Sequence, residues 1–293
     1  MSSFKLVAVA TILAAALNGC ASQHQGHSTS PAAAVLDQHD SASGHVEQTP
    51  QVTSPIATPR QGDLRGHPSD WPLPVHDNQA FTFLRAEQLE YRARDGAPDV
   101  ARWEAQGWHG RDYEKLWFKT EGEQSVEGGS EGELELQALY SRLVSPFWNF
   151  QVGARYDTQW GTGPDSDRWL GVVGVQGFSR YEFEVEAALF VSEEADVSAR
   201  LTASTDILFT QRLILQPRFE TELSFSNVPE FQVGEGLNYV DLGLRLRYEL
   251  KREFAPYLGA NWIQSLGQTE DFLTTAGGES NDLALVMGLS LWF

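Results

Sequence analysis

The feature that most constrains this chain is a regular alternation of apolar and polar residues. In the segment 281–293, NDLALVMGLSLWF, apolar side chains occupy every second position from Leu283 to Phe293. Successive side chains of a β-strand point to opposite faces, so this period predicts a strand with one apolar face.

The same alternation recurs upstream and allows the strands to be counted. In YEFEVEAALF, for example, Glu182, Glu184 and Glu186 fall on the face opposite to Phe183 and Val185. The connections near residues 145, 179, 209 and 251 are tight, and those between them are mostly longer. We predict twelve strands, near 80–93, 100–107, 112–124, 131–144, 147–158, 167–178, 181–192, 196–208, 211–226, 237–251, 254–266 and 281–293.

These strands predict an all-β fold, a transmembrane antiparallel up-and-down β-barrel of about twelve strands over residues 78–293. A soluble β-sandwich also alternates, but Glu, Asp and Arg on the second face fit a polar lumen better. A terminal Phe293 resembles the C-terminal signal of outer-membrane barrels, and aromatic residues such as Trp117 are expected at the lipid interface. Short periplasmic turns and longer outer loops would place both ends of the barrel in the periplasm, with outer-membrane lipid around it.

The N-terminal residues predict export, followed by a disordered segment. Lys5 precedes an apolar stretch, 6–17, that is too short to span a bilayer, so we assign residues 1–20 to a secretion signal. Cys20 follows in a context similar to a lipoprotein lipobox, which leaves lipidation and ordinary cleavage as alternatives. Residues 21–77 are expected to be a periplasmic tether, since 21–70 contain no aromatic residue or Met and cannot offset their ordering entropy.

Candidate metal ligands concentrate in this tether. Imidazole and carboxylate groups come together at His39, Asp40 and His45, and this ligand set suits Cu(II) or Zn(II). A polar linker also collects histidines that have no binding role, so the pattern leaves metal binding open. The candidates before the barrel are His24, His27, His39, Asp40, His45, His67 and His76.

The barrel itself offers few metal ligands of the nitrogen or sulfur type. His109 is its only histidine, in the predicted turn GWHGRD at the periplasmic rim. There it either hydrogen-bonds the turn or contacts a metal together with Asp112, Glu114 or a residue of the tether. Met287 is predicted to face lipid, so the barrel has no thioether cluster for Cu(I).

Acidic side chains recur on the predicted lumen face. They form either a cation path or a rigid network with arginines, and unpaired buried carboxylates are costly, so we expect pairing for most of them. A path remains open through any carboxylate in excess, and the net charge of −19 favours cations over nucleic acid as partners. The acids are Glu121, Glu123, Glu133, Glu135, Asp157, Glu182, Glu184, Glu186, Glu220 and Glu222; the arginines are Arg142, Arg155, Arg212, Arg218, Arg245 and Arg247.

Five blocks of the barrel sequence resemble the copper resistance protein B family, over essentially all of residues 80–293. They are WEAQGWHGRDYEKLWFKTEGE, LYSRLVSPFWNFQVGARYD, GVQGFSRYEFEVEAALFVS, TQRLILQPRFE and GLRLRYELKREFAPYLG. The resemblance implies copper resistance at the outer membrane, copper ions bound and passed through the barrel, and periplasmic partners such as a multicopper oxidase. Many members carry Met-, Asp- and His-containing repeats in the N-terminal segment. This chain keeps His and Asp there without Met, which favours Cu(II) over Cu(I).

The leading hypothesis is therefore an outer-membrane copper-binding protein whose tether captures copper ions and concentrates them at the barrel mouth. A non-selective small channel or a structural barrel is the alternative, because twelve strands lie between filled eight-stranded and open sixteen-stranded barrels. We expect no enzymatic activity, since a hydrolase needs a base beside its nucleophile and His109 is the barrel's only imidazole.

Overall fold

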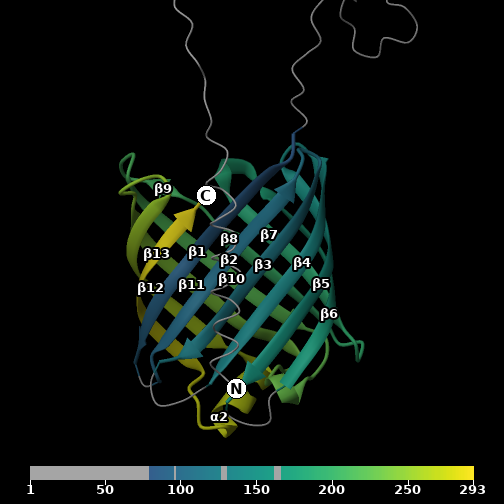
Figure 1. The fold of residues 1–293 in the computed structure, drawn as a ribbon. Coiled ribbons are helices and arrows are strands. Elements are labelled where there is room, and N and C mark those ends of the chain that lie inside the picture. The colour runs from purple at the N-terminus through teal and green to yellow at the C-terminus, as the bar shows by residue number, and fades with distance from the viewer. Residues whose placement is uncertain (1–78, 96, 127–130, 162–165) are drawn as a thin grey trace, which may run out of the picture. The chain divides into compact units, whose positions relative to one another are not determined.

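Alternating apolar and polar residues build a closed antiparallel β-barrel (Figure 1). The computed structural model describes residues 79–95, 97–126, 131–161 and 166–293. Its strands are β1 (Phe81–Arg94), β2 (Val100–Gly110), β3 (Glu114–Ser125), β4 (Gly132–Ser145), β5 (Trp148–Trp160), β6 (Ser166–Phe178), β7 (Glu184–Ser192), β8 (Val197–Ser204), β9 (Ile207–Leu208), β10 (Leu213–Ser224), β11 (Gly236–Tyr248), β12 (Phe254–Ser265) and β13 (Asn281–Trp292).

Several predictions concern residues outside this described part of the chain. These are the secretion signal, the tether, Cys20, and the candidate ligands His24, His27, His39, Asp40, His45, His67 and His76.

Each strand pairs with its neighbour in sequence, and the circle closes where β1 pairs with β13. The two-residue β9 continues β8 along the same partner, β10, so the barrel has twelve strand positions. Phe293 completes the closure, because its N–H donates to the carbonyl of Leu84 at 2.8 Å and its carbonyl accepts from the N–H of Leu84 at 3.1 Å. Closure pairs the edges that an open sheet would leave exposed. The predicted twelve-stranded barrel is confirmed.

The outer face of the barrel is apolar. On β13, Leu283, Leu285 and Met287 are exposed outward, and Ala284 and Val286 between them are buried. Exposed Leu, Val and aromatic residues continue this surface over the other strands, for instance Leu242, Leu244 and Leu246 of β11. An apolar outer surface around a closed barrel fits an outer-membrane protein.

No helix among the described residues has the length and apolar composition needed to cross a membrane.

The two ends of the barrel carry connections of different length. The end with both barrel termini has the connections 111–113, 146–147, 179–183, 209–212 and 249–253, and we call it the short-turn end. The opposite, long-loop end has 95–99, 126–131, 161–165, 193–196, 225–235 and 266–280. Two of these loops contain the 3₁₀ turn η3 (Pro229–Phe231) and the helix α2 (Gly267–Thr275), which lies at the end opposite to the C-terminus (Figure 1).

Three predicted strand boundaries are off by three residues, and the predicted direction of Trp117 is wrong. The second strand ends at Gly110 instead of residue 107, and β11 ends at Tyr248 instead of residue 251. The seventh strand begins at Glu184 instead of residue 181, because Tyr181 and Glu182 adopt left-handed φ values of 65° and 61° in the turn η2 (Arg180–Glu182). Trp117 is buried, and it shares the inward face of β3 with Lys119 and Glu121. It packs in an apolar cluster inside the barrel with Leu139, Leu170, Val172, Ala188 and Phe190, and so it does not belong to a lipid-facing belt.

Candidate functional site

Charged side chains fill the barrel lumen. Nine of the predicted acids lie on inward faces of the strands: Glu121, Glu123, Glu133, Glu135, Asp157, Glu184, Glu186, Glu220 and Glu222. The tenth, Glu182, is exposed in the η2 turn at the short-turn end, where it lines the mouth instead of the strand wall.

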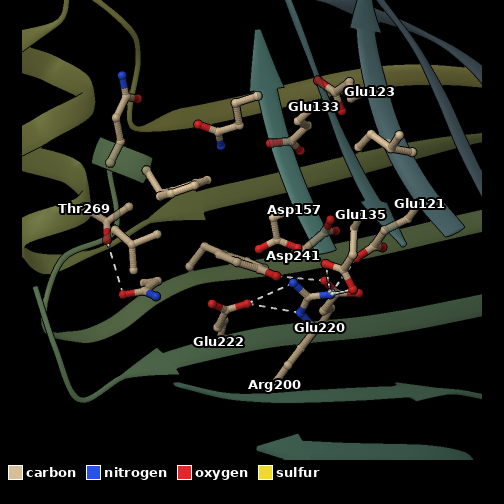
Figure 2. Close-up of a pocket in the computed structure, with 18 of the residues that line it drawn as sticks. Glu121, Glu123, Glu133, Glu135, Asp157, Arg200, Glu220, Glu222, Asp241 and Thr269 are labelled. Atoms are coloured by element: carbon tan, nitrogen blue, oxygen red, sulfur yellow. Dashed lines mark hydrogen bonds and ion pairs between the residues drawn. The ribbon is translucent and has the colours of Figure 1, made fainter. Parts of the chain in front are cut away.

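The lumen contains three cavities. A mouth of about 970 Å³ opens at the short-turn end, and a central cavity of about 60 Å³ lies between β2, β3, β4, β7, β8 and β10. A cavity of about 370 Å³, which we call the vestibule, lies at the long-loop end under η3 and α2 (Figure 2). Phe231, Thr269 and Leu273 contribute to its lining.

The vestibule has more acidic than basic side chains. Its lining includes eight carboxylates and four guanidinium groups. The acids are Glu121, Glu123, Glu133, Glu135, Asp157, Glu220, Glu222 and Asp241, and the bases are Arg102, Arg155, Arg168 and Arg200.

Strand register forces several of these carboxylates together. Glu121 lies directly opposite Glu135, and Glu135 lies directly opposite Asp157 on the next strand. Like charges in directly opposite positions destabilise a sheet, so the arrangement requires cations between them. Arginines of β5 and β8 supply those cations.

Arg200 of β8 contacts three of these carboxylates. Its guanidinium lies 2.5 Å from Glu121, 3.1 Å from Glu135 and 3.0 Å from Glu222 (Figure 2). Arg155 continues the network with contacts of 2.6 Å to both Glu135 and Asp157. Arg102 also lies 3.5 Å from Glu121 and Arg168 lies 2.9 Å from Asp157, so Glu121, Glu135 and Asp157 each contact two guanidinium groups.

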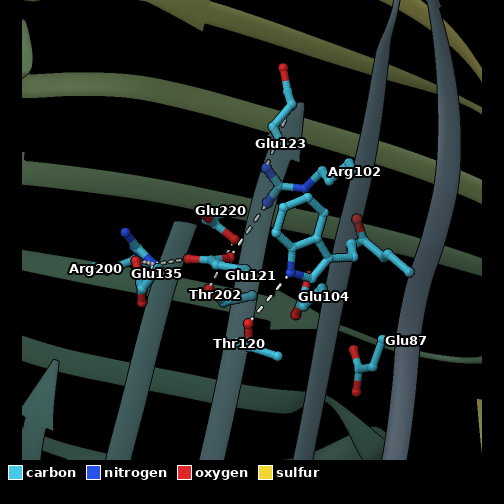
Figure 3. Close-up of polar contacts among 12 residues, drawn as sticks. Glu87, Arg102, Glu104, Thr120, Glu121, Glu123, Glu135, Arg200, Thr202 and Glu220 are labelled. Atoms are coloured by element: carbon cyan, nitrogen blue, oxygen red, sulfur yellow. Dashed lines mark hydrogen bonds and ion pairs between the residues drawn. The ribbon is translucent and has the colours of Figure 1, made fainter. Parts of the chain in front are cut away.

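Arg218 of β10 makes a second set of contacts closer to the short-turn end. Its guanidinium lies 2.6 Å from Glu104 and 2.8 Å from Glu220. Tyr239 also donates its hydroxyl to Glu220 at 2.8 Å. Figure 3 shows Glu104, Glu121 and Glu220 side by side, with Glu87 beyond Glu104. Pairing therefore accounts for most of the lumen acids.

Two vestibule acids are exceptions to this pairing. Glu133 and Asp241 have no hydrogen bond or ion pair with any described residue, although Glu133 lies opposite Glu123 and Asp241 opposite Glu220. They are the carboxylates that the arginines leave in excess.

A separate buried cluster stabilises the barrel wall beside the closure. Glu90 of β1 is fully buried, and it accepts hydrogen bonds from Arg92 at 2.7 Å, from Tyr257 at 2.9 Å and from Arg245 at 2.9 and 3.0 Å. Gln88 accepts from the same Arg245 at 3.1 Å. None of these residues lines the three cavities, so we assign the cluster to stability.

Some residues that face the lumen were not predicted from the alternation of the sequence. The register of β1 shifts between Ala86 and Gln88, so both Glu87 and Gln88 contact lumen side chains and simple alternation fails there. Arg102 and Glu104 carried a usable signal, because they alternate with Ala101 and Trp103 in the expected period. Other missed lumen residues include Lys119, Arg168 and Arg200.

Two of the predicted lumen arginines lie elsewhere. Arg142 is exposed on the outer face of β4, because the inward positions of this strand are Glu135, Gln137, Leu139 and Ser141. Arg212 is exposed in the turn 209–212. Arg155, Arg218, Arg245 and Arg247 face the lumen as predicted.

His109 lies within β2 and not in a turn. Its neighbour Trp108 packs against the internal apolar cluster, so His109 faces outward, and its Nδ1 lies 2.8 Å from the hydroxyl of Thr82. Among the described residues, no group of three or more His, Cys, Asp or Glu side chains is arranged to hold a metal ion. His109 therefore belongs to no such group within the described part of the chain.

Comparisons with solved structures find other barrels of low sequence identity. A KdgM porin matches with a TM-score of 0.45 and 9% identity, over 72% of this chain and 99% of that chain. A NanC porin matches with a TM-score of 0.44 and 8% identity, over 72% and 99% respectively.

Comparisons of sequence are more specific. The family model described as Copper resistance protein B precursor matches residues 80–293. Copper resistance protein B of Escherichia coli is 33% identical over 93% of this chain and 90% of its own length. A Copper resistance protein B homolog of Pseudomonas syringae pv. tomato is 37% identical over 75% of this chain and 72% of its own length. With its twelve-stranded barrel and a family match over that whole barrel, the chain belongs to the copper resistance protein B family.

Proposed function

We propose that this protein contributes to copper resistance by binding copper ions in the vestibule and passing them through the barrel. Family membership supports the role in copper resistance, and the excess of carboxylates in the vestibule supports the place of binding. Glu133 and Asp241 carry this proposal, since neither is neutralised by a described partner.

The charge of the long-loop end favours the approach of cations. The six long loops contain no Lys, Arg or His. They contain acidic residues throughout: Asp95, Asp99, Glu127, Glu131, Asp165, Glu193, Glu194, Asp196, Glu230, Glu235, Glu270, Asp271 and Glu279. Clefts and surfaces of one sign raise the local concentration of counter-ions, so this end would draw copper ions toward the vestibule.

We propose Cu(II) as the ion that the barrel handles. Carboxylate oxygens accept Cu(II), whereas Cu(I) prefers thioether and thiolate sulfur. Met287 faces outward on β13 and the vestibule lining has no sulfur atom. Since no three acids among the described residues are arranged as a metal site, the ion would keep part of its water shell between neighbouring carboxylates.

The proposed role of the N-terminal segment rests on its ligands. We propose that His24, His27, His39, Asp40, His45, His67 and His76 capture copper in the periplasm and raise its concentration at the short-turn mouth. Periplasmic copper-handling proteins, such as a multicopper oxidase, would be the partners on that side. We propose no catalytic activity for the barrel.

Calorimetric titration with Cu(II) tests the vestibule. In the full chain, Glu133→Gln combined with Asp241→Asn should weaken or remove one class of binding sites. The matched control, Glu249→Gln with Glu253→Gln, removes the same charge at the short-turn end and should leave that class unchanged. Equal titration curves for all three proteins would refute the vestibule as a copper site.

A second titration separates the N-terminal segment from the barrel. Deleting residues 23–70 should remove the tightest Cu(II) sites and lower copper tolerance of cells that depend on this protein. Unchanged binding and tolerance would contradict capture by the segment and leave the barrel as the binding part. Planar-bilayer currents that are insensitive to copper would instead favour the alternative of a non-selective channel.

A further inference from the structure

Arg200 reaches across the barrel instead of along its wall. It is carried by β8, yet its guanidinium contacts Glu121 of β3 at 2.5 Å and Glu135 of β4 at 3.1 Å. Strands β5, β6 and β7 lie between β4 and β8 in the sheet, so these contacts cross the interior. Glu222, the residue paired with Arg200 on the adjacent strand β10, lies 3.0 Å from the same guanidinium.

The position of Arg200 coincides with the boundary between two cavities. Arg200 lines the vestibule and also the central cavity of about 60 Å³, and so do Glu121, Glu135 and Glu220. Figure 2 shows the guanidinium directed toward these carboxylates from the vestibule side, and Figure 3 shows it beside Glu121 and Glu135. An ion leaving the vestibule for the central cavity therefore meets this group.

An aromatic ring also contacts the guanidinium of Arg200. The ring of Phe190 lies 5.5 Å from the guanidinium carbon of Arg200 and 4.6 Å from that of Arg155. Phe190 itself is buried in the internal apolar cluster. Ion pairs on one side and an aromatic ring on the other restrict the side chain to the crossing conformation.

We propose that Arg200 is a built-in counter-ion that closes the lumen between vestibule and central cavity and sets the passage of cations. This inference rests on the proposed function, in which the vestibule accepts copper ions. A cation that advances must replace the guanidinium at Glu121 and Glu135, and the fixed positive charge opposes its entry. Arg218, with Glu104 and Glu220, forms a second crossing contact behind it.

Potassium conductance in planar bilayers tests this role without copper. Arg200→Gln should raise the single-channel conductance in KCl several-fold and shift the reversal potential toward stronger cation selectivity. The control is Arg245→Gln, which removes the same charge from a more deeply buried arginine that lines none of the three cavities. It should conduct like the unmodified protein.

A second variant covers the case in which Arg200→Gln fails to fold. Arg200→Gln with Glu222→Gln removes both members of an ion pair and keeps the net charge, and it should also conduct more than the unmodified chain. Folding of each variant is checked by circular dichroism. The inference is overturned if folded Arg200 variants conduct like the unmodified protein, or if Arg245→Gln opens the barrel to the same degree.

The conductance measurements and the Cu(II) titrations test the two proposals independently. If the vestibule variant Glu133→Gln/Asp241→Asn binds Cu(II) normally while Arg200→Gln opens the pore, the proposed copper site is wrong and the counter-ion role remains. If copper binding depends on the vestibule acids but Arg200→Gln changes no current, the copper site remains and Arg200 serves only to neutralise acids of the barrel wall.

Discussion

Removing the carboxylate of Glu90 should destabilise the barrel more than removing any partly exposed lumen acid. Its side chain is fully buried and accepts four hydrogen bonds, from Arg92, Tyr257 and Arg245. Glu90→Gln keeps the shape but leaves the buried Arg245 without its counter-ion and Arg92 with only Glu123, at 3.9 Å. Breaking a buried ion pair from one side costs about 3–5 kcal/mol, so we expect a loss of that order in the free energy of unfolding.

The assay is urea unfolding of the lipid-reconstituted barrel, followed by tryptophan fluorescence. The control is Glu186→Gln, whose partner Lys119 lies at 2.6 Å and whose side chain is 30% exposed. An ion pair that water reaches contributes only about 0–1 kcal/mol, so the control should unfold close to the unmodified protein.

A double-mutant cycle sharpens the result. If Glu90 and Arg245 act as one unit, Glu90→Gln with Arg245→Gln should cost less than the sum of the two single changes, by about 0.5–3 kcal/mol. A loss below about 1 kcal/mol for Glu90→Gln would refute the reasoning, because a loss that small is expected for an exposed ion pair and not for a buried one.

Three further predictions concern other parts of the barrel. A Cβ atom at Gly122 would collide with the ring of Trp103 and with the backbone carbonyl of Glu133, so Gly122→Ala should lower the urea midpoint by the equivalent of about 1–3 kcal/mol. An unchanged midpoint would show that both neighbours move aside without cost. Met287 is 57% exposed at the middle of β13, so Met287→Arg should cost about 2–4 kcal/mol in lipid, and a neutral result would argue against a lipid-facing position. The Tyr91 hydroxyl donates to Asp99 in the loop 95–99 and lowers the pKa of that carboxyl, so this hydrogen bond stabilises the loop at pH values above the ordinary carboxyl pKa and is lost as the pH falls through the lowered pKa. Tyr91→Phe should raise the Asp99 pKa in an NMR titration. An unchanged pKa would exclude this cause.

The strands of this protein could be predicted because a strand's pattern is local. Alternation in segments such as 281–293 depends only on which side chains share a face, and every one of the twelve predicted strand positions is occupied. The faces of Glu121, Glu135, Glu220 and Glu222 follow from the same period. Where the backbone departs from regular strand geometry, at the β1 bulge and at Tyr181 and Glu182, the period gave the wrong boundary or direction.

The pairing of lumen charges could not be read in this way. Arg200 meets Glu121 across 79 positions of sequence, and Arg218 meets Glu104 across 114. Such contacts depend on the stagger of all the strands around the closed barrel, and each strand adds its own register to the sum.

The sequence by itself determined the number of strands, the apolar outer face, the acidic lumen and the family, since each is encoded within short stretches of chain. Only the tertiary structure decided which acids are neutralised, that Glu133 and Asp241 are left in excess, that Trp117 points inward and that Arg200 crosses between two cavities. The physical reason is that a charge's partner is chosen by distance in space, and closure of the barrel sets those distances.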